Sequence, residues 1–319
     1  MGVEGTKSIV DEIMRLGMKC NFRCPFCNVF DNEKCPELSL EDAKKLADTF
    51  IGKAEVISIS GGEPTVYPYL VELIEYMSTE HSRINLQTNA VLVTNEMAEE
   101  FAAAGLSMAF VNLPSHVPSV YAELTGTSPE FLNKALEGIH SIIDAGIPVT
   151  VNLVINETNR ESLSEYLEFI HKELPRVKVV NFSVIQPHGM AQKNSHLVPD
   201  YRDLKKQLKN AIDLSKELDI HLVNPFCGLP TCITYGILPL EASSEYLAAK
   251  KIRHSKLDER VPHSQPSQIG IISASKTKVP SCVDCYLKNF CMGPWTAYPK
   301  IRGDVVEPPF RALRFWPQG

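Results

Sequence analysis

Short, strongly apolar runs alternate with amphipathic helical patterns along this chain, and that alternation limits the folds open to it. Six runs rich in Val and Ile predict strands: Ile13–Met18, Val56–Ser60, Ile84–Thr88, Met108–Leu113, Val149–Ile155 and Val179–Ile185. Runs that are apolar almost throughout are typical of parallel strands covered on both faces. Because a helical pattern separates each pair, right-handed crossovers are expected to join the strands into one parallel sheet.

The helical segments have recognisable ends. Ser39 and Asp42 resemble a capping box ahead of "AKKLADTF". Ser128 and Pro129 are expected to begin the helix "EFLNKALEGIHSIIDA", which Gly146 would end. The fold class predicted is α/β, a partial (β/α)6 TIM-like barrel followed by a small irregular C-terminal extension. In such folds the working residues follow the C-terminal ends of strands.

Composition narrows the class of protein. The chain has 319 residues, is 44% hydrophobic and carries a formal net charge of −6, which disfavours a nucleic-acid partner. No apolar run is long enough to span a bilayer, and the N-terminal residues do not form a signal peptide. Nine cysteines without such a signal point to a reducing compartment. We therefore expect a cytoplasmic protein with no membrane partner.

Three of the cysteines, Cys20, Cys24 and Cys27, form a C-x3-C-x2-C motif directly after the first predicted strand. Three thiolates cannot complete a tetrahedral zinc site unaided. They can hold three irons of a [4Fe–4S] cluster, which leaves the fourth iron open to another ligand. A zinc site completed by Cys35, or plain buried thiols, is the alternative.

The second predicted strand runs directly into "GGEPT", which comprises Gly61, Gly62, Glu63, Pro64 and Thr65. Two glycines let a backbone approach a ligand closely, and the carboxylate beside them can pair with an ammonium group. The alternative is a simple turn between strand and helix. No G-K-[ST] follows, so the segment is not a phosphate loop.

"CNFRCPFC" followed one strand–helix unit later by "GGEPT" resembles the radical S-adenosylmethionine (SAM) superfamily. The resemblance implies that Cys20, Cys24 and Cys27 bind three irons and that the amino and carboxylate groups of SAM chelate the fourth. It also implies SAM-contacting residues in the first two loops and at later strand ends: Phe26, Gly61, Gly62, Glu63, Pro64, Thr88, Asn89, Asn112, Asn152 and Val154. At each of the later strand ends, an ordinary polar turn residue is the alternative.

The family's chemistry would then apply. A reduced cluster cleaves SAM to methionine and a 5′-deoxyadenosyl radical, which abstracts hydrogen from a substrate C–H bond. Such chemistry implies a flavodoxin- or ferredoxin-type reductant. The cofactor carries the difficult step, while the protein positions the target carbon and excludes water.

Five further cysteines lie in the last third of the chain: Cys227, Cys232, Cys282, Cys285 and Cys291. The last three form C-x2-C-x5-C, and one residue of the earlier pair would complete a second, auxiliary [4Fe–4S] cluster. A structural zinc site would use the same donors. The residue of the pair that is not a ligand would be inert or would donate hydrogen.

This C-terminal segment resembles the SPASM and twitch extensions of radical SAM enzymes. Trp295 stands where a full SPASM domain continues with cysteine, and no cysteine follows Cys291, so the resemblance implies one auxiliary cluster. The expected domains are a radical SAM core over residues 10–222 and an auxiliary-cluster region over 223–310. The polar stretch 243–270 between the cysteine groups is expected to be a surface insertion.

Two substrate classes and one non-enzymatic function remain open. Relatives with such extensions often modify peptides by oxidation, crosslinking or epimerisation, so a peptide substrate is favoured. Only nineteen residues precede Cys20, which predicts no fused leader-recognition domain and keeps a small molecule, an aminocyclitol or a nucleotide, as the alternative. A non-catalytic iron–sulfur or zinc scaffold is the third reading, which the "GGEPT" motif disfavours.

Overall fold

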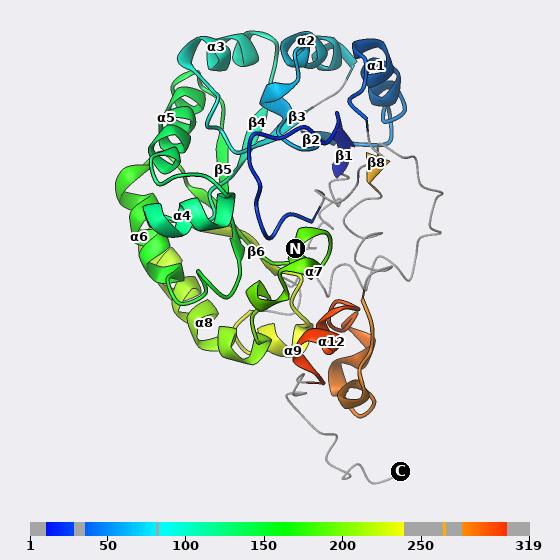
Figure 1. Cartoon of the computed structure of the whole chain (residues 1–319), viewed down its shortest axis with the longest axis vertical. Coiled ribbons are helices and arrows are strands. Elements are labelled where there is room, and N and C mark those ends of the chain that lie inside the picture. The colour runs from blue at the N-terminus through cyan, green and yellow to red at the C-terminus, as the bar shows by residue number, and fades with distance from the viewer. Residues whose placement is uncertain (1–10, 29–35, 81–82, 239–263, 266–275, 305–319) are drawn as a thin grey trace, which may run out of the picture.

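The computed structural model describes residues 11–28, 36–80, 83–238, 264–265 and 276–304. An open, curved sheet forms its centre, and helices cover the outer side of the sheet (Figure 1). Within the described residues, no helix combines the length and apolar character needed to cross a membrane.

The sheet has eight strands in the order β7-β6-β5-β4-β3-β2-β1-β8. They are β1 Asp11–Arg15, β2 Val56–Ser60, β3 Ile84–Thr88, β4 Met108–Asn112, β5 Val149–Ile155, β6 Val179–Val184, β7 His221–Cys227 and β8 Ser264–Gln265. The first seven run parallel, each beside its neighbour in sequence, and β8 pairs antiparallel with β1. The α/β class and the six-unit partial barrel are confirmed, and two strands are added to them.

Both added strands, and the start of the sheet, correct the sequence-based prediction. β1 begins and ends earlier than predicted, so Leu16 to Met18 already belong to the loop that leads to the cysteine motif. β7 occupies a segment that was expected to begin the irregular extension. β8 lies inside stretch 243–270, whose other residues fall outside the described ranges, as does Cys35.

The helices fill the intervals between the strands. They are α1 Leu40–Asp48, α2 Leu70–Glu80, α3 Asn95–Ala103, α4 Pro118–Thr125, α5 Phe131–Asp144, α6 Leu163–Glu173, α7 Met190–Lys193, α8 Tyr201–Glu217, α9 Thr231–Thr234 and α12 Tyr298–Arg302. The predicted cap of α1 is confirmed, since the Ser39 hydroxyl accepts from the Asp42 N–H at 3.2 Å. The predicted cap of α5 is wrong, because Ser128 donates to the Glu130 carboxylate instead.

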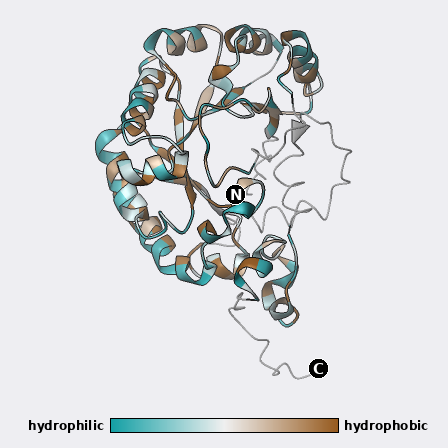
Figure 2. Cartoon of the chain, viewed as in Figure 1, coloured by the Kyte–Doolittle hydropathy of each residue, from teal (hydrophilic) through white to brown (hydrophobic). Residues whose placement is uncertain are grey.

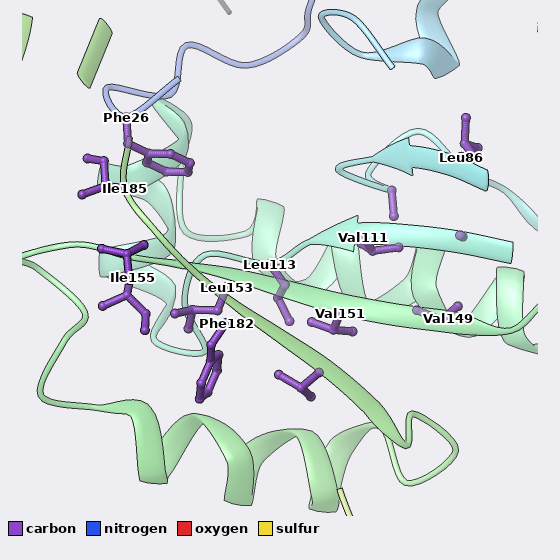
Figure 3. Packing of buried hydrophobic residues seen from close by; sticks show 14 of the residues in the cluster. Phe26, Leu86, Val111, Leu113, Val149, Val151, Leu153, Ile155, Phe182 and Ile185 are labelled. Atoms are coloured by element: carbon purple, nitrogen blue, oxygen red, sulfur yellow. The ribbon is translucent and has the colours of Figure 1, made fainter. Parts of the chain in front are cut away.

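The two faces of the strands differ in character. In β5, Val149, Val151, Leu153 and Ile155 are buried and belong to the main hydrophobic core. Figure 3 shows these residues together with core residues of neighbouring strands, Leu86 of β3, Val111 of β4 and Phe182 of β6. Figure 2 shows hydrophobic residues along the strands and hydrophilic ones on the outer turns of the helices. The residues that alternate with this core series face inward, so the barrel interior is available for a polar site.

Candidate active site

The cysteine motif lies on the loop that follows β1, where the sequence predicts it. Cys20, Cys24 and Cys27 are partly buried free thiols. Burial raises the pKa of the Cys20 and Cys24 thiols, and for Cys24 the charges of Cys27 and Cys20 raise it further. Burial thus favours the protonated form of Cys20 and Cys24, and a bound cation would stabilise the thiolate form.

Backbone hydrogen bonds hold this cysteine loop from three sides. The Gly62 N–H donates to Gly17 O, and the Glu63 N–H donates to Lys19 O, both at 2.9 Å. The Arg23 N–H donates at 3.0 Å to the O atom of Thr125, the last residue of α4. The loop thus has a fixed conformation that depends on segments far away in sequence.

The segment after β6, which includes α7, is hydrogen-bonded to the other end of the cysteine loop. The Met190 N–H donates to Cys27 O at 2.9 Å, and the Asn194 side-chain amide donates to Pro25 O at 3.2 Å. Gly189 has φ +56°, and a Cβ there would lie 2.9 Å from Cys27 O. Residues 186–191, the "QPHGMA" segment, therefore pack directly on the cysteine motif.

Gly62 is required for a close approach between the two motifs. A Cβ at this position would lie 2.0 Å from Lys19 O and 2.5 Å from Lys19 C. Any side chain there would push the cysteine loop away. The glycines of "GGEPT" thus bring the loop and the second strand into contact, in addition to the role expected from the sequence.

Glu63 is a buried carboxylate with every side-chain oxygen satisfied. Its Oε1 accepts from the Thr88 hydroxyl at 2.5 Å and from the Thr65 N–H and hydroxyl at 3.1 and 2.8 Å. Its Oε2 accepts from the Asn89 N–H at 2.8 Å. Burial raises the pKa of Glu63, and these hydrogen bonds oppose the rise. The carboxylate therefore ties the end of β2 to the end of β3.

A row of amide side chains crosses the inner face of the sheet. Strand register places Asn112 beside Asn152 and Asn152 beside Asn181. The Asn152 amide donates to Asn112 Oδ1 at 3.3 Å, while Asn181 and Ser183 donate to Asn152 Oδ1 at 2.6 and 3.2 Å. The row is polar and uncharged.

These elements enclose a cavity of about 290 Å³ at the C-terminal ends of the strands. Most of the predicted site residues line it: Cys20, Cys24, Phe26, Cys27, Gly62, Glu63, Thr88, Asn89, Asn112, Asn152 and Val154. Gly61 and Pro64 do not line it. Further residues that were not predicted from the sequence also line it: Phe22, Asn28, Ser60, Gln87, Phe110, Ser183, Val184 and Gln186. Several of these residues occupy strand ends, and that position in the sequence could have identified them as candidate site residues.

The cavity suits the cofactors that the motif implies. Three thiols stand beside a hollow whose volume is near the lower end of small-molecule sites, roughly 300–1,000 Å³.

A second group of thiols lies in the C-terminal part. Cys232, Cys282, Cys285 and Cys291 are buried and line one small pocket. Burial raises the pKa of Cys232, and the charges of the other three thiols raise it further. The Thr231 and Gly293 N–H groups each donate to Cys291 Sγ at 3.3 Å. Cys232 lines this pocket together with the three late cysteines, which makes it a candidate fourth donor.

Trp295 packs between the two cysteine regions. It is fully buried, the Lys276 ammonium lies 4.0 Å from its ring centroid, and the His188 ring meets it edge-on at 5.5 Å. Lys276 also donates to Gly228 O at 2.6 Å. Burial, and then the charge of Lys276, lower the pKa of His188. Trp295, which was expected to stand in place of a cysteine, therefore joins the "QPHGMA" segment to the C-terminal region.

Comparisons with known proteins agree with this geometry. The Radical SAM superfamily model matches residues 14–170. An AdoMet-dependent heme synthase of Methanosarcina barkeri is 28% identical over 207 residues, which are 64% of this chain and 58% of that protein. A probable GTP 3′,8-cyclase of Saccharolobus islandicus is 26% identical over 235 residues, which are 72% of this chain and 74% of that protein.

Solved structures show the same fold. SuiB of Streptococcus suis bound to the precursor peptide SuiA has a TM-score of 0.63 at 16% identity, covering 96% of this chain and 75% of that one. SuiB bound to S-adenosylmethionine also has a TM-score of 0.63, at 17% identity and covering 90% and 72%. Residues 14–170 of this chain therefore form a radical SAM domain, and proteins of that superfamily bind a [4Fe–4S] cluster and SAM.

Proposed function

We propose that this enzyme removes a hydrogen atom from a C–H bond of a peptide and thereby oxidises, crosslinks or epimerises it. When bound at the cysteine loop, the [4Fe–4S] cluster and SAM supply the 5′-deoxyadenosyl radical for that step. Cys20, Cys24 and Cys27 would hold the cluster. The other residues of the cavity would bind SAM and the substrate, orient the target C–H bond and shield it from water.

The protein's contribution is positional. Glu63 O and Pro64 O already accept from the Val66 and Tyr67 N–H groups at 3.1 and 2.9 Å, so the carbonyl groups of Gly61 and Gly62 are the ones we assign to an ammonium group. Phe26 presents an apolar surface at the same cavity, which Asn112 and Asn152 line with amide groups. This arrangement offers an adenosine-like molecule apolar and polar surfaces and excludes water from the reacting carbon.

The residues that line the cavity are the main reason for proposing a peptide substrate. Among the described residues that line it there is no Lys, Arg or His, and its one acid, Glu63, is fully hydrogen-bonded. A triphosphate would need several cationic partners. Amide and hydroxyl groups instead match the donors and acceptors of a peptide backbone. Structural likeness over 96% of the chain to a protein solved with a precursor peptide gives further support.

A small-molecule substrate is the second candidate. The sequence relatives are named as a heme synthase and probable GTP cyclases, and a planar or nucleoside-like substrate accords with those names. The aminocyclitol or nucleotide alternative therefore keeps independent support. Cationic residues outside the described ranges would be needed to bind phosphates.

For the C-terminal thiols we propose an auxiliary [4Fe–4S] cluster held by Cys232, Cys282, Cys285 and Cys291. All four line one pocket. The donor set is complete, so this cluster has no open iron and serves to transfer electrons or to stabilise the fold. We further propose that residues 10–222 form the catalytic core and residues 223–310 the auxiliary-cluster region.

The test uses anaerobically purified protein with SAM and dithionite. We expect 5′-deoxyadenosine from the native chain and none from the Cys24→Ala variant. Deuterated peptide fractions and deuterated nucleotides are then supplied separately. Deuterium in 5′-deoxyadenosine from the peptide fraction supports the proposal, and deuterium from nucleotides alone contradicts it. A native chain that contains clusters but forms no 5′-deoxyadenosine would indicate a scaffold.

A further inference from the structure

Three large apolar side chains are exposed within eight consecutive residues of the C-terminal region. Val283, Tyr286 and Phe290 are 66%, 70% and 38% exposed, and we call them the outer patch. Val283 and Tyr286 are the most exposed large apolar residues in the described part of the chain. Exposed apolar groups gathered in this way are typical of an interaction surface.

The same short turns that expose the outer patch direct the cysteines inward. Cys282, Cys285 and Leu287 are buried, whereas Val283, Tyr286 and Phe290 alternate with them on the outside. Two 3₁₀ turns, Pro280–Cys282 and Tyr286–Asn289, produce this alternation. The outer patch therefore lies one residue away from the proposed ligands of the auxiliary cluster.

The patch lies in a positively charged segment of an acidic protein. Residues 276–304 contain five Lys or Arg and two Asp, a net charge of +3, while the whole chain carries −6. Lys278 and Lys288 are exposed, and both bind carbonyl groups of these turns: Lys278 donates to Lys288 O at 2.8 Å and Lys288 to Val283 O at 3.1 Å. An apolar centre with a basic surround complements an acidic partner.

We propose that the outer patch docks an acidic one-electron carrier protein that reduces the auxiliary cluster. This inference rests on the proposed function in one respect, the presence of a cluster at the four C-terminal thiols. One electron leaves the flavin or iron–sulfur centre of the carrier, which is oxidised by one electron, and the cluster is reduced by one. No proton or leaving group is involved.

The position of the patch favours a carrier over a peptide substrate. None of its three residues lines the barrel cavity, and two of its neighbours in sequence, Cys282 and Cys285, line the auxiliary pocket. Electron transfer needs a short path from surface to cluster and only a small, transient interface. A peptide substrate would need to reach the cavity instead.

The experiment measures binding of a purified acidic flavodoxin to the cluster-loaded chain at several salt concentrations. We expect Tyr286→Ala to weaken binding about tenfold, because a central aromatic residue dominates small interfaces. Lys288→Gln, which keeps an amide donor for Val283 O, should weaken it about two- to fivefold and reduce the salt dependence. Asp284→Asn should strengthen it by a similar factor.

Matched controls lie elsewhere on the surface. Tyr69 is 45% exposed, and Lys209 lies on α8, so Tyr69→Ala and Lys209→Gln should change binding less than twofold. Iron and sulfide content, measured for every variant, identifies any that have lost the cluster. If the flavodoxin does not bind at low salt, or if Tyr286→Ala and Tyr69→Ala behave alike, the inference is wrong. The inference is also overturned if Tyr286→Ala abolishes self-association or peptide binding while flavodoxin binding is unchanged.

Dithionite separates this inference from the proposed function, because a small reductant needs no docking surface. We expect Tyr286→Ala to retain dithionite-driven bleaching of the cluster absorbance and to lose flavodoxin-driven bleaching. If dithionite bleaches the clusters and supports 5′-deoxyadenosine formation but flavodoxin never binds, only the docking surface is refuted. If the native chain holds no iron at the C-terminal thiols, the auxiliary-cluster proposal fails first.

Discussion

Replacing Gly62 with alanine should separate the two motifs that build the site. The added Cβ would meet Lys19 O at 2.0 Å and Met18 O at 2.7 Å. Ordinary contacts of a Cβ begin at about 3.4 Å, so the cysteine loop must move by more than 1 Å. Such a movement breaks or lengthens the two bonds from the Gly62 and Glu63 N–H groups, each 2.9 Å long.

The magnitude follows from those two effects. Two backbone hydrogen bonds contribute about 1–3 kcal/mol together, and overpacking typically costs another 1–3 kcal/mol. We therefore expect the Gly62→Ala variant to lose roughly 2–6 kcal/mol of unfolding free energy, unless the loop yields locally and limits the loss to the lower end. Iron bound at the cysteine loop should decrease in either case.

The assay combines denaturant unfolding with iron and sulfide analysis of anaerobically purified protein. Gly146→Ala is the matched control, because a Cβ there meets nothing within 4 Å and adds only the strain of φ +83°. That strain costs about 1 kcal/mol. A Gly62→Ala protein with the stability and iron content of the native chain would refute the steric reasoning.

Three other substitutions probe the rest of the molecule. Cys232→Ser should remove the auxiliary cluster, about half of the iron, whereas Cys227→Ser should retain it; equal iron in both would contradict the choice of Cys232. Trp295→Ala should cost about 3–5 kcal/mol, since the ring is fully buried, and a loss below 1 kcal/mol by urea unfolding would show that the packing contributes little. The folded-state pKa of His188 is lowered from 6.5, so native stability should fall as pH drops below 6.5. His188→Gln should lose less stability over that range, and parallel pH profiles would disprove the assignment.

The strands and the first cysteine site could be predicted because local sequence determines them. β2, β3 and β5 are dense in β-branched residues, and their predicted bounds match the structure. β7 escaped prediction because Pro225 and Asn224 interrupt its pattern, and pairing with β6 supplies what local propensity lacks. β8 is two residues long and exists only through its pairing with β1.

Other parts of the site depend on tertiary register, which no single segment encodes. The row through Asn112, Asn152 and Asn181 becomes visible only when β4, β5 and β6 are aligned. The C-terminal thiol group likewise becomes visible only when Cys232 of α9 and the turns that carry Cys282, Cys285 and Cys291 meet at one pocket. From the sequence, Trp295 is only a residue in the place of a cysteine, because its contact with His188 joins segments about a hundred residues apart.

The hydrogen bonds from Met190 and Asn194 to the cysteine loop also affect when the iron–sulfur centre can be assembled. Cys27 and Met190 are 163 positions apart in the sequence, yet the hydrogen bond between their backbones helps to fix the loop. During synthesis on a ribosome, Cys20, Cys24 and Cys27 emerge long before that partner exists. Assembly machinery that delivered iron and sulfide to the nascent chain would meet an unshaped loop, so maturation of this centre belongs after translation of the sixth strand–helix unit.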